Sequence, residues 1–266
     1  MKKVFSIITT LTFIAALTAC NDIKPEDRYI ELPPVEAQRV VLLEEFTGQN
    51  CVNCPDAHKV IENLLEQYPE NLIAVSFHGG PLSINVNDRP FGLGNDESNN
   101  YWEMAGKPDL PAAIVNRSGG TQTSDKWANA IRTIIEKPSV IEMELTADYD
   151  AADKSIKIAA KISPNQNMDA NLQLWVVEDS LVRRQTLPTG KTDPAYVHNN
   201  VFRAAVNSVT GETIRLITRE PQTREYVVKM SDEWEVPENL KIVAFITGAS
   251  GVEQAVKAPV KVNKNE

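Results

Sequence analysis

The sequence predicts an α/β domain followed by an all-β antiparallel sandwich, because its apolar residues change their period near Pro138. Before Pro138, short apolar runs typical of buried strands alternate with segments in which apolar residues recur at helical spacing. After Pro138, apolar residues recur at every second position, as in strands with one buried face. Alternating strands and helices indicate α/β layers, whereas short strands with almost no helical signal indicate a sandwich.

The first 19 residues are a predicted targeting segment and not part of the fold. Lys2 and Lys3 form a positive start, and residues 4–17 form an apolar run that is short for a membrane span. The run ends in Leu17-Thr18-Ala19-Cys20, which resembles the lipobox of bacterial lipoproteins. The resemblance implies that Cys20 becomes the lipidated N-terminus of the mature protein. The alternative is a plain secretory signal followed by an incidental cysteine.

Residues 20–38 are a predicted linker, because Pro25, Pro33 and Pro34 favour an extended chain. Beyond the linker we expect two domains, at residues 39–138 and 139–266. The composition, with 42% hydrophobic and 24% charged residues, is that of a globular protein.

The mature chain is strongly acidic. Removal of the signal takes away two of the 27 basic residues and none of the 36 acidic ones, which leaves a net charge of −11. This charge argues against nucleic acid as a partner and against electrostatic docking on anionic lipid. No later apolar run reaches about 18 residues, so the lipid anchor is the only expected membrane contact. The oligomeric state is open.

The elements of the first domain follow from local patterns. Residues 39–46 and 71–78 are apolar segments that favour β-strands, and the second is typical of a buried parallel strand. Between them, residues 55–67 have helical spacing, and Pro55 suits a first turn because its missing N–H is not needed there. The remaining expected elements are a loop over 79–94, a short helix over 96–105, a strand over 112–116, a turn at 118–120, and a helix over 124–136 with Ser124 as its N-cap.

The second domain is predicted to be an immunoglobulin-like sandwich. Residues 140–149 and 155–162 read as a hairpin joined by a short turn. Trp175 is expected in the sandwich core. Further strands are expected over 172–177, 201–209, 213–217, 225–229, 241–247 and 253–262.

The most informative motif is a Cys-x-x-Cys pair, Cys51 and Cys54, between a predicted strand and a predicted helix. A helix N-terminus lowers the pKa of a cysteine thiol, and Cys51 is placed for that effect. A spacing of three residues brings Cys54 within disulfide reach. A structural disulfide is the competing interpretation, since an exported protein with one cysteine pair often has one. A four-residue loop removes little entropy from the unfolded chain, so a redox site is favoured.

The cysteine segment resembles the active-site region of the thioredoxin fold. The resemblance implies that Cys51 attacks or is attacked, that Cys54 resolves the mixed disulfide, and that Glu45 is a buried acid that relays a proton. The alternative to a buried acid is that Glu45 is an exposed carboxylate at the strand end and that Glu44 points inward instead. Thioredoxins differ at Asn50 and at the two residues between the cysteines, so the redox potential does not follow from the resemblance.

A second segment with the same resemblance is Leu110-Pro111, which precedes a predicted strand. The resemblance implies a cis peptide bond before Pro111 and a role for Pro111 in holding the backbone of a partner; a trans turn proline is the alternative. Leu110, Asn50 and His78 are candidate substrate-binding residues. His78 ends a strand and either lines the site or is an ordinary hydrogen-bonded loop residue.

No metal or separate cofactor is expected beyond the disulfide itself and the lipid on Cys20. Two cysteines and three scattered histidines do not supply the ligand pairs of a zinc site. His198 lies in an asparagine-rich turn and is expected to be structural.

Four segments together resemble one protein family: Glu44 to Pro55, Leu72 to His78, Leu110 to Arg117 and His198 to Arg203. They are similar to the outer-membrane lipoproteins related to "outer membrane protein twenty-eight" of anaerobic oral and gut bacteria. The resemblance implies a thioredoxin-like N-terminal half and a lipid-anchored location at the outer membrane, facing the periplasm or the cell surface.

We therefore expect a cell-envelope protein that performs thiol–disulfide exchange through Cys51 and Cys54, with a protein thiol or disulfide as its partner. The alternative is a non-enzymatic surface lipoprotein, an adhesion or ligand-binding module in which Cys51–Cys54 is a structural disulfide. The second half of the chain, which shows no catalytic motif, supports the alternative.

Overall fold

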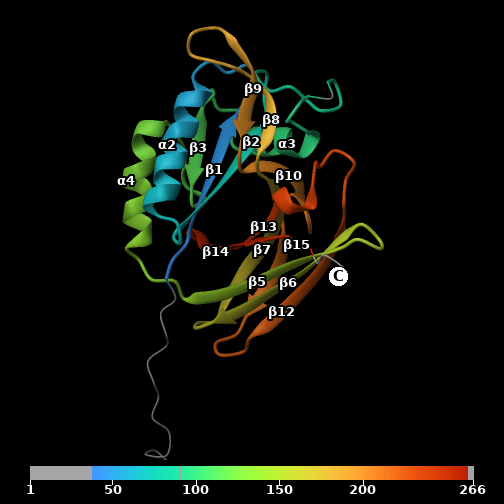
Figure 1. Cartoon of the computed structure of the whole chain (residues 1–266). Helices are drawn as coiled ribbons and strands as arrows, with labels where there is room; N and C mark the ends of the chain where they lie inside the picture. The colour runs from blue at the N-terminus through green and yellow to red at the C-terminus, as the bar shows by residue number, and fades with distance from the viewer. Residues whose placement is uncertain (1–37, 90, 263–266) are drawn as a thin grey trace, which may run out of the picture. The chain divides into compact units, whose positions relative to one another are not determined.

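The computed structural model describes residues 38–262 except residue 90, and Figure 1 shows the arrangement of their elements. The predicted signal segment, Cys20 and the linker up to residue 37 lie outside the described residues. The described residues belong to one compact unit. The boundary expected between residues 138 and 139 stays a prediction. None of the helices in the described part of the chain has the length and apolar character needed to cross a bilayer.

Two parallel strands form the centre of the N-terminal half. In β1 (Val41–Thr47) and β2 (Leu72–His78) every residue is buried, and Thr47 lies opposite His78. The helix α2 (Cys54–Gln67) connects them, with Pro55 in its first turn as expected. Side chains on opposite faces of β1 and β2 enter two different apolar clusters. One contains residues of the helices around Ile61 and Ile131, and the other contains Tyr101 and residues of the C-terminal half. Both faces of these strands are therefore covered.

The other N-terminal elements extend this layer. The strand β3 (Ala112–Val115) pairs antiparallel with β1, and β4 (Ser118–Gln122) pairs with β3. The helix α3 (Asp96–Met104) carries a capping box from Asn95 and Ser98. The helix α4 (Ser124–Ile135) lies beside α2 in Figure 1. The expected turn at residues 118–120 is part of β4, and the N-cap of α4 is Thr123 instead of Ser124.

The C-terminal half is almost entirely β. A four-stranded sheet contains β5 (Ile141–Asp150), β6 (Ser155–Pro164), β12 (Gln222–Lys229) and β15 (Lys261–Val262), and the predicted hairpin of β5 and β6 is present. The strands β7 (Met168–Glu178), β10 (Val201–Ala205), β11 (Glu212–Leu216), β13 (Leu240–Gly248) and β14 (Gly251–Pro259) belong to a larger sheet. One apolar cluster contains residues of both sheets, an arrangement compatible with a β-sandwich.

Two further strands, β8 (Leu181–Thr186) and β9 (Thr192–His198), form a separate antiparallel hairpin. A short 3₁₀ helix, η2 (Pro237–Asn239), precedes β13. The sequence patterns predicted no strands over residues 181–198. Figure 1 shows the β8–β9 hairpin beside β2 and rising past the N-terminal end of α2.

The predicted fold class, a thioredoxin-like α/β domain followed by a separate all-β domain, is wrong. Strands make up 48% of the structure and helices only 17%. The strands β1 to β4 belong to a nine-stranded sheet in the order β14-β13-β7-β10-β2-β1-β3-β4, with β11 on β7. The two halves join where β10 pairs in parallel with β2, at Val201 and Ser76. No local pattern marks this pairing, because the paired residues are far apart in the sequence.

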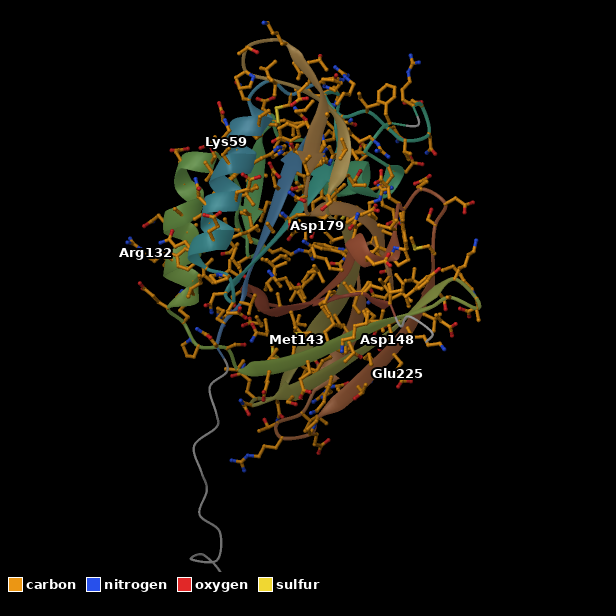
Figure 2. The ribbon with its side chains drawn as sticks, viewed as in Figure 1. Lys59, Arg132, Met143, Asp148, Asp179 and Glu225 are labelled. Carbon is orange, nitrogen blue, oxygen red and sulfur yellow. A yellow bond between two sulfur atoms is a disulfide. The ribbon has the colours of Figure 1, made fainter. Side chains whose placement is uncertain are left out.

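An aromatic cluster shared by the two halves explains why the sheet continues across this junction. The ring of Phe77 lies 4.7 Å from Tyr101, 5.2 Å from Trp175 and 4.8 Å from Phe202, measured between centroids. Trp175, which was expected in the sandwich core, is fully buried in this cluster instead. Figure 2 shows side chains filling the molecule between its sheets, with Lys59 and Arg132 on the outer surfaces of α2 and α4.

Candidate functional site

The two cysteines form a disulfide at the start of α2. Their Cα atoms are 5.4 Å apart, and Cys54 is the first helical residue, after the N-cap Asn53. Cys51 precedes the helix, and its backbone N–H donates to the carbonyl of Gly48 over 3.0 Å.

Both sulfur-bearing residues are covered. Cys51 is 2% exposed and Cys54 is 0% exposed, although the adjacent Val52 is 42% exposed. A partner cannot reach the disulfide in this arrangement without a movement of the surrounding chain.

The β8–β9 hairpin holds the segment before the disulfide. The side-chain amide of Gln185 donates to the carbonyl of Cys51 over 2.9 Å, and the guanidinium of Arg184 donates to the side chain of Asn50 over 2.8 Å. The backbone N–H of Thr186 donates to the carbonyl of Gln49 over 2.9 Å. Asn50, a predicted substrate-binding residue, is exposed apart from this contact.

Glu45 lies on β1 with its side chain fully buried, so it is not an exposed carboxylate at the strand end. The hydroxyl of Ser76 donates to Glu45 Oε2 over 2.6 Å, and His58 Nε2 lies 3.4 Å from Oε1. Burial raises the pKa of Glu45, and this effect outweighs the lowering by His58 and by the Ser76 hydrogen bond. Glu44 is also buried, but its carboxylate accepts a hydrogen bond from Arg117 over 2.8 Å.

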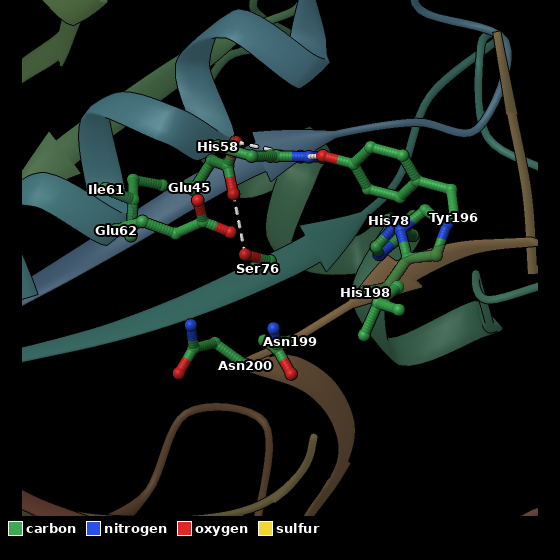
Figure 3. A pocket seen from close by; sticks show the side chains of 11 residues that line it. Glu45, His58, Ile61, Glu62, Ser76, His78, Tyr196, His198, Asn199 and Asn200 are labelled. Atoms are coloured by element: carbon green, nitrogen blue, oxygen red, sulfur yellow. Dashed lines mark hydrogen bonds and ion pairs between the residues drawn. The ribbon is translucent and has the colours of Figure 1, made fainter. Parts of the chain in front are cut away.

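His58 connects Glu45 to the hairpin. It stands four residues after Cys54, so the two side chains share one face of α2. Its Nε2 lies 3.0 Å from the hydroxyl of Thr47, and its Nδ1 lies 2.9 Å from the hydroxyl of Tyr196 on β9. Figure 3 shows the imidazole held between β1 and Tyr196.

The other two histidines complete the cluster. His78, at the end of β2, and His198, at the end of β9, have ring centroids 5.4 Å apart, and His198 lies 6.3 Å from His58. Burial lowers the pKa of His198 to about 3 and holds the pKa of His78 well below its ordinary value. Both rings are therefore neutral near pH 7. The three histidines are thus not scattered, as the sequence suggested.

A small cavity lies among these side chains. Its volume is about 30 Å³, which is room for one or two water molecules. It is lined mainly by Glu45, His58, Ser76, His78, Tyr196 and His198. Figure 3 shows that these residues come from β1, α2, β2 and β9. Within residues 38–262, residue 90 apart, no group of His, Cys, Asp or Glu side chains is arranged to hold a metal ion.

The Leu110–Pro111 peptide bond is cis, as predicted. The next residue, Ala112, pairs with Phe46 on β1, so Pro111 stands level with the Thr47 end of that strand. Leu110 and Pro111 are partly exposed.

Three residues at the site were missed from the sequence: His58, Gln185 and Tyr196. The spacing between Cys54 and His58 is a usable local signal, because residues four apart on a helix are neighbours. Gln185 and Tyr196 carry no such signal. Their contacts with Cys51 and His58 join residues that are more than 130 positions apart in the sequence.

The family model described as outer membrane protein Omp28 matches residues 95–264. HBP35 of Porphyromonas gingivalis is similar in structure, with a TM-score of 0.68 and 15% identity over 86% of this chain and 79% of that one. A crystal structure of a protein from Agrobacterium tumefaciens has a TM-score of 0.53 and 15% identity over 86% and 99% of the two chains. Identities this low show the fold alone. No curated protein matches.

Proposed function

This chain belongs to the outer membrane protein Omp28 family, and we propose that it is a lipid-anchored cell-envelope protein whose Cys51–Cys54 pair exchanges disulfides with protein thiols. Cys20 carries the lipid in this proposal, which rests on the lipobox-like sequence around it.

The observation that carries the proposal is the buried Glu45 carboxylate paired with His58, which stands one helical turn after the disulfide-bonded Cys54. A disulfide that only closes a loop needs no ionisable neighbours, and burying a carboxylate costs free energy. Thiol–disulfide exchange does need such a group, since the leaving thiolate takes up a proton.

The reaction proceeds in two displacements when a partner dithiol reduces the pair. A partner thiolate attacks Cys51 Sγ, the Cys51–Cys54 bond breaks, and Cys54 leaves as a thiolate that takes up a proton. The second partner thiolate then attacks the partner's sulfur in the mixed disulfide, and Cys51 leaves. The partner ends as a disulfide and the Cys51–Cys54 pair as a dithiol; oxidation of a partner is the reverse sequence.

The partly exposed residues around the disulfide are the proposed binding surface. Leu110 and Pro111 stand level with the end of β1, and Asn50 directly precedes Cys51. We place the partner's backbone along Leu110 and Pro111 and its side chains near Asn50. Because His78 is buried and lines the cavity, its proposed role is to shape the site behind the disulfide.

The test is turnover with purified mature protein. Insulin reduction by dithiothreitol should accelerate with the wild type and lose the acceleration with Cys51→Ser, whereas Cys54→Ser should accumulate a mixed disulfide with the partner. Absence of turnover together with a reduction potential below about −300 mV would identify a structural disulfide and overturn the proposal.

A second candidate function, a non-enzymatic surface module, is favoured by the burial of both cysteines under the hairpin. In that case the double variant Cys51→Ser/Cys54→Ser keeps every cell-surface phenotype of the wild type. Loss of a phenotype with a folded double variant would exclude this candidate.

A further inference from the structure

We propose, on the basis of the exchange activity proposed above, that the Glu45–His58 pair holds the proton that Cys54 receives when the disulfide opens, and that Tyr196 positions His58 for this transfer. The C-terminal half thereby supplies a residue to a redox site that lies in the N-terminal half.

The helix makes His58 a neighbour of Cys54, and an ion-pair contact makes it a neighbour of Glu45. Cys54 and His58 occupy positions i and i+4 of α2, so their side chains lie on one face, one turn apart. From that face His58 Nε2 reaches to 3.4 Å from Glu45 Oε1. The other carboxylate oxygen is held by Ser76, whereas Oε1 is buried with no hydrogen-bond partner in the structure. Oε1 is therefore free to exchange a proton with the imidazole.

Both ring nitrogens of His58 are engaged, which sets the orientation of the ring. Nε2 faces the hydroxyl of Thr47 as well as Glu45, and Nδ1 faces the hydroxyl of Tyr196. The ring of Tyr196 packs against His198, with centroids 4.8 Å apart, so the tyrosine is itself held by the hairpin. A hydroxyl can donate to Nδ1 of a neutral ring or accept from a protonated one, so Tyr196 supports His58 in both states.

Among the ionisable groups around the cavity, Glu45 and His58 are the two that can exchange a proton with each other. The facing groups are Glu45 and Thr47 of β1, Glu62 of α2, Ser76 and His78 of β2, and Tyr196 and His198 of β9. His78 and His198 stay neutral because burial lowers their pKa, and burial raises the pKa of Tyr196 to about 12. Glu62 is exposed to solvent. No lysine or arginine is among the described residues that line this cavity.

The proton balance of the first displacement is then complete. When a thiolate attacks Cys51, the electron pair of the broken bond stays on Cys54 Sγ, and the proton shared by Glu45 and His58 moves to that sulfur. Solvent restores the proton through the cavity, whose volume of about 30 Å³ admits one or two water molecules. In the reverse direction the pair takes the proton from the Cys54 thiol.

The experiment measures the rate of disulfide reduction by dithiothreitol from pH 5 to pH 9, corrected for the thiolate fraction of the reductant. The wild type should show an inflection that His58→Gln and Glu45→Gln both lose. His58→Gln should also reduce the rate by roughly 100-fold, the lower end of general acid–base contributions. Tyr196→Phe should keep an inflection but shift it. The matched control is Tyr226→Phe, which removes the same hydroxyl from β12, where it donates to Glu212.

A folded His58→Gln protein with the wild-type profile would overturn the proposal. A second measurement uses the wild type alone: at one fixed pH the His58 imidazole resonances should differ between the oxidised and the reduced protein, and identical resonances would likewise overturn the proposal. Dithiothreitol acts on the pair whether or not protein substrates do. Failure of insulin turnover with the inflection intact would therefore count against the proposed function alone.

Discussion

At the scale of single residues, the site depends on ionisable side chains that have little access to water. Glu45 is fully buried with Ser76 as its hydrogen-bond donor, and His78 and His198 are buried as neutral rings. These groups respond to pH in opposite directions, because burial disfavours whichever form of each group is charged.

Glu45→Gln should make the free energy of unfolding less sensitive to pH. The pKa of Glu45 is raised above 4.5, so its contribution to stability is fully present below pH 4.5 and is lost as pH rises through the folded-state pKa. Glutamine cannot ionise and avoids this loss. Urea unfolding at a series of pH values should show the stability of the variant gaining on the wild type above pH 4.5. Because His78 and His198 contribute equally to both proteins, parallel curves would contradict the expectation.

A buried ion pair between Arg203 and Glu178 lies away from the cysteines. Arg203 Nε lies 3.1 Å from Glu178 Oε2, with side chains 5% and 0% exposed. Arg203→Met leaves the Glu178 carboxylate buried without its partner, and should reduce the free energy of unfolding by about 3–5 kcal/mol. Denaturant titration measures the change.

The matched control for this pair is exposed. Lys59 and Asp56 form an ion pair whose side chains are 69% and 65% exposed, so Lys59→Met should change stability by at most about 1 kcal/mol. Adding Glu178→Gln to Arg203→Met should restore part of the loss. Equal losses of stability in Arg203→Met and Lys59→Met would show that burial of the pair does not determine the loss.

At the scale of elements, the β8–β9 hairpin decides how accessible the disulfide is. It contacts the chain from Gln49 to Cys51 through Arg184, Gln185 and Thr186. The hairpin was missed in the sequence because its strands are half polar and because β9 contains Pro194, which opposes a strand assignment.

Arg184→Ala should make the disulfide easier to reduce. The variant loses the hydrogen bond to Asn50, and a loss of about 1 kcal/mol raises the population of an opened hairpin by about fivefold. The measurement is the rate at which dithiothreitol exposes Cys51 to alkylation. Arg183→Ala is the control, since Arg183 lies on the same strand but pairs with Glu235, 2.7 Å away. Equal rates for both variants would show that the contact with Asn50 does not limit access.

At the scale of the whole molecule, one sheet and one aromatic cluster connect the two halves. Residues 39–138 contribute Phe46, Phe77 and Tyr101 to this cluster, and later residues contribute Trp175 and Phe202. Removal of the second half exposes one face of β1 and β2 and leaves the edge of β2 unpaired.

Residues 36–138 alone should therefore not fold. A truncated protein should lack the dispersed amide resonances and the cooperative thermal transition that we expect of residues 36–266. A cooperatively folded fragment would instead support the domain boundary predicted between residues 138 and 139.

The sequence by itself determined the local elements: the buried strands β1 and β2, the helix α2 with its proline, the β5–β6 hairpin, and the position of the cysteine pair. These follow from side-chain periodicity and from turn and capping residues, which act within a few positions. It also pointed to the family that the comparison identifies.

Only the tertiary structure decided that Glu45 points inward, that three distant histidines meet, and that β10 joins β2 to make one sheet of both halves. Each of these depends on pairings between residues far apart in the chain. Such pairings are decided by the burial of shared apolar surface and by backbone hydrogen bonds at strand edges, neither of which has a local signature.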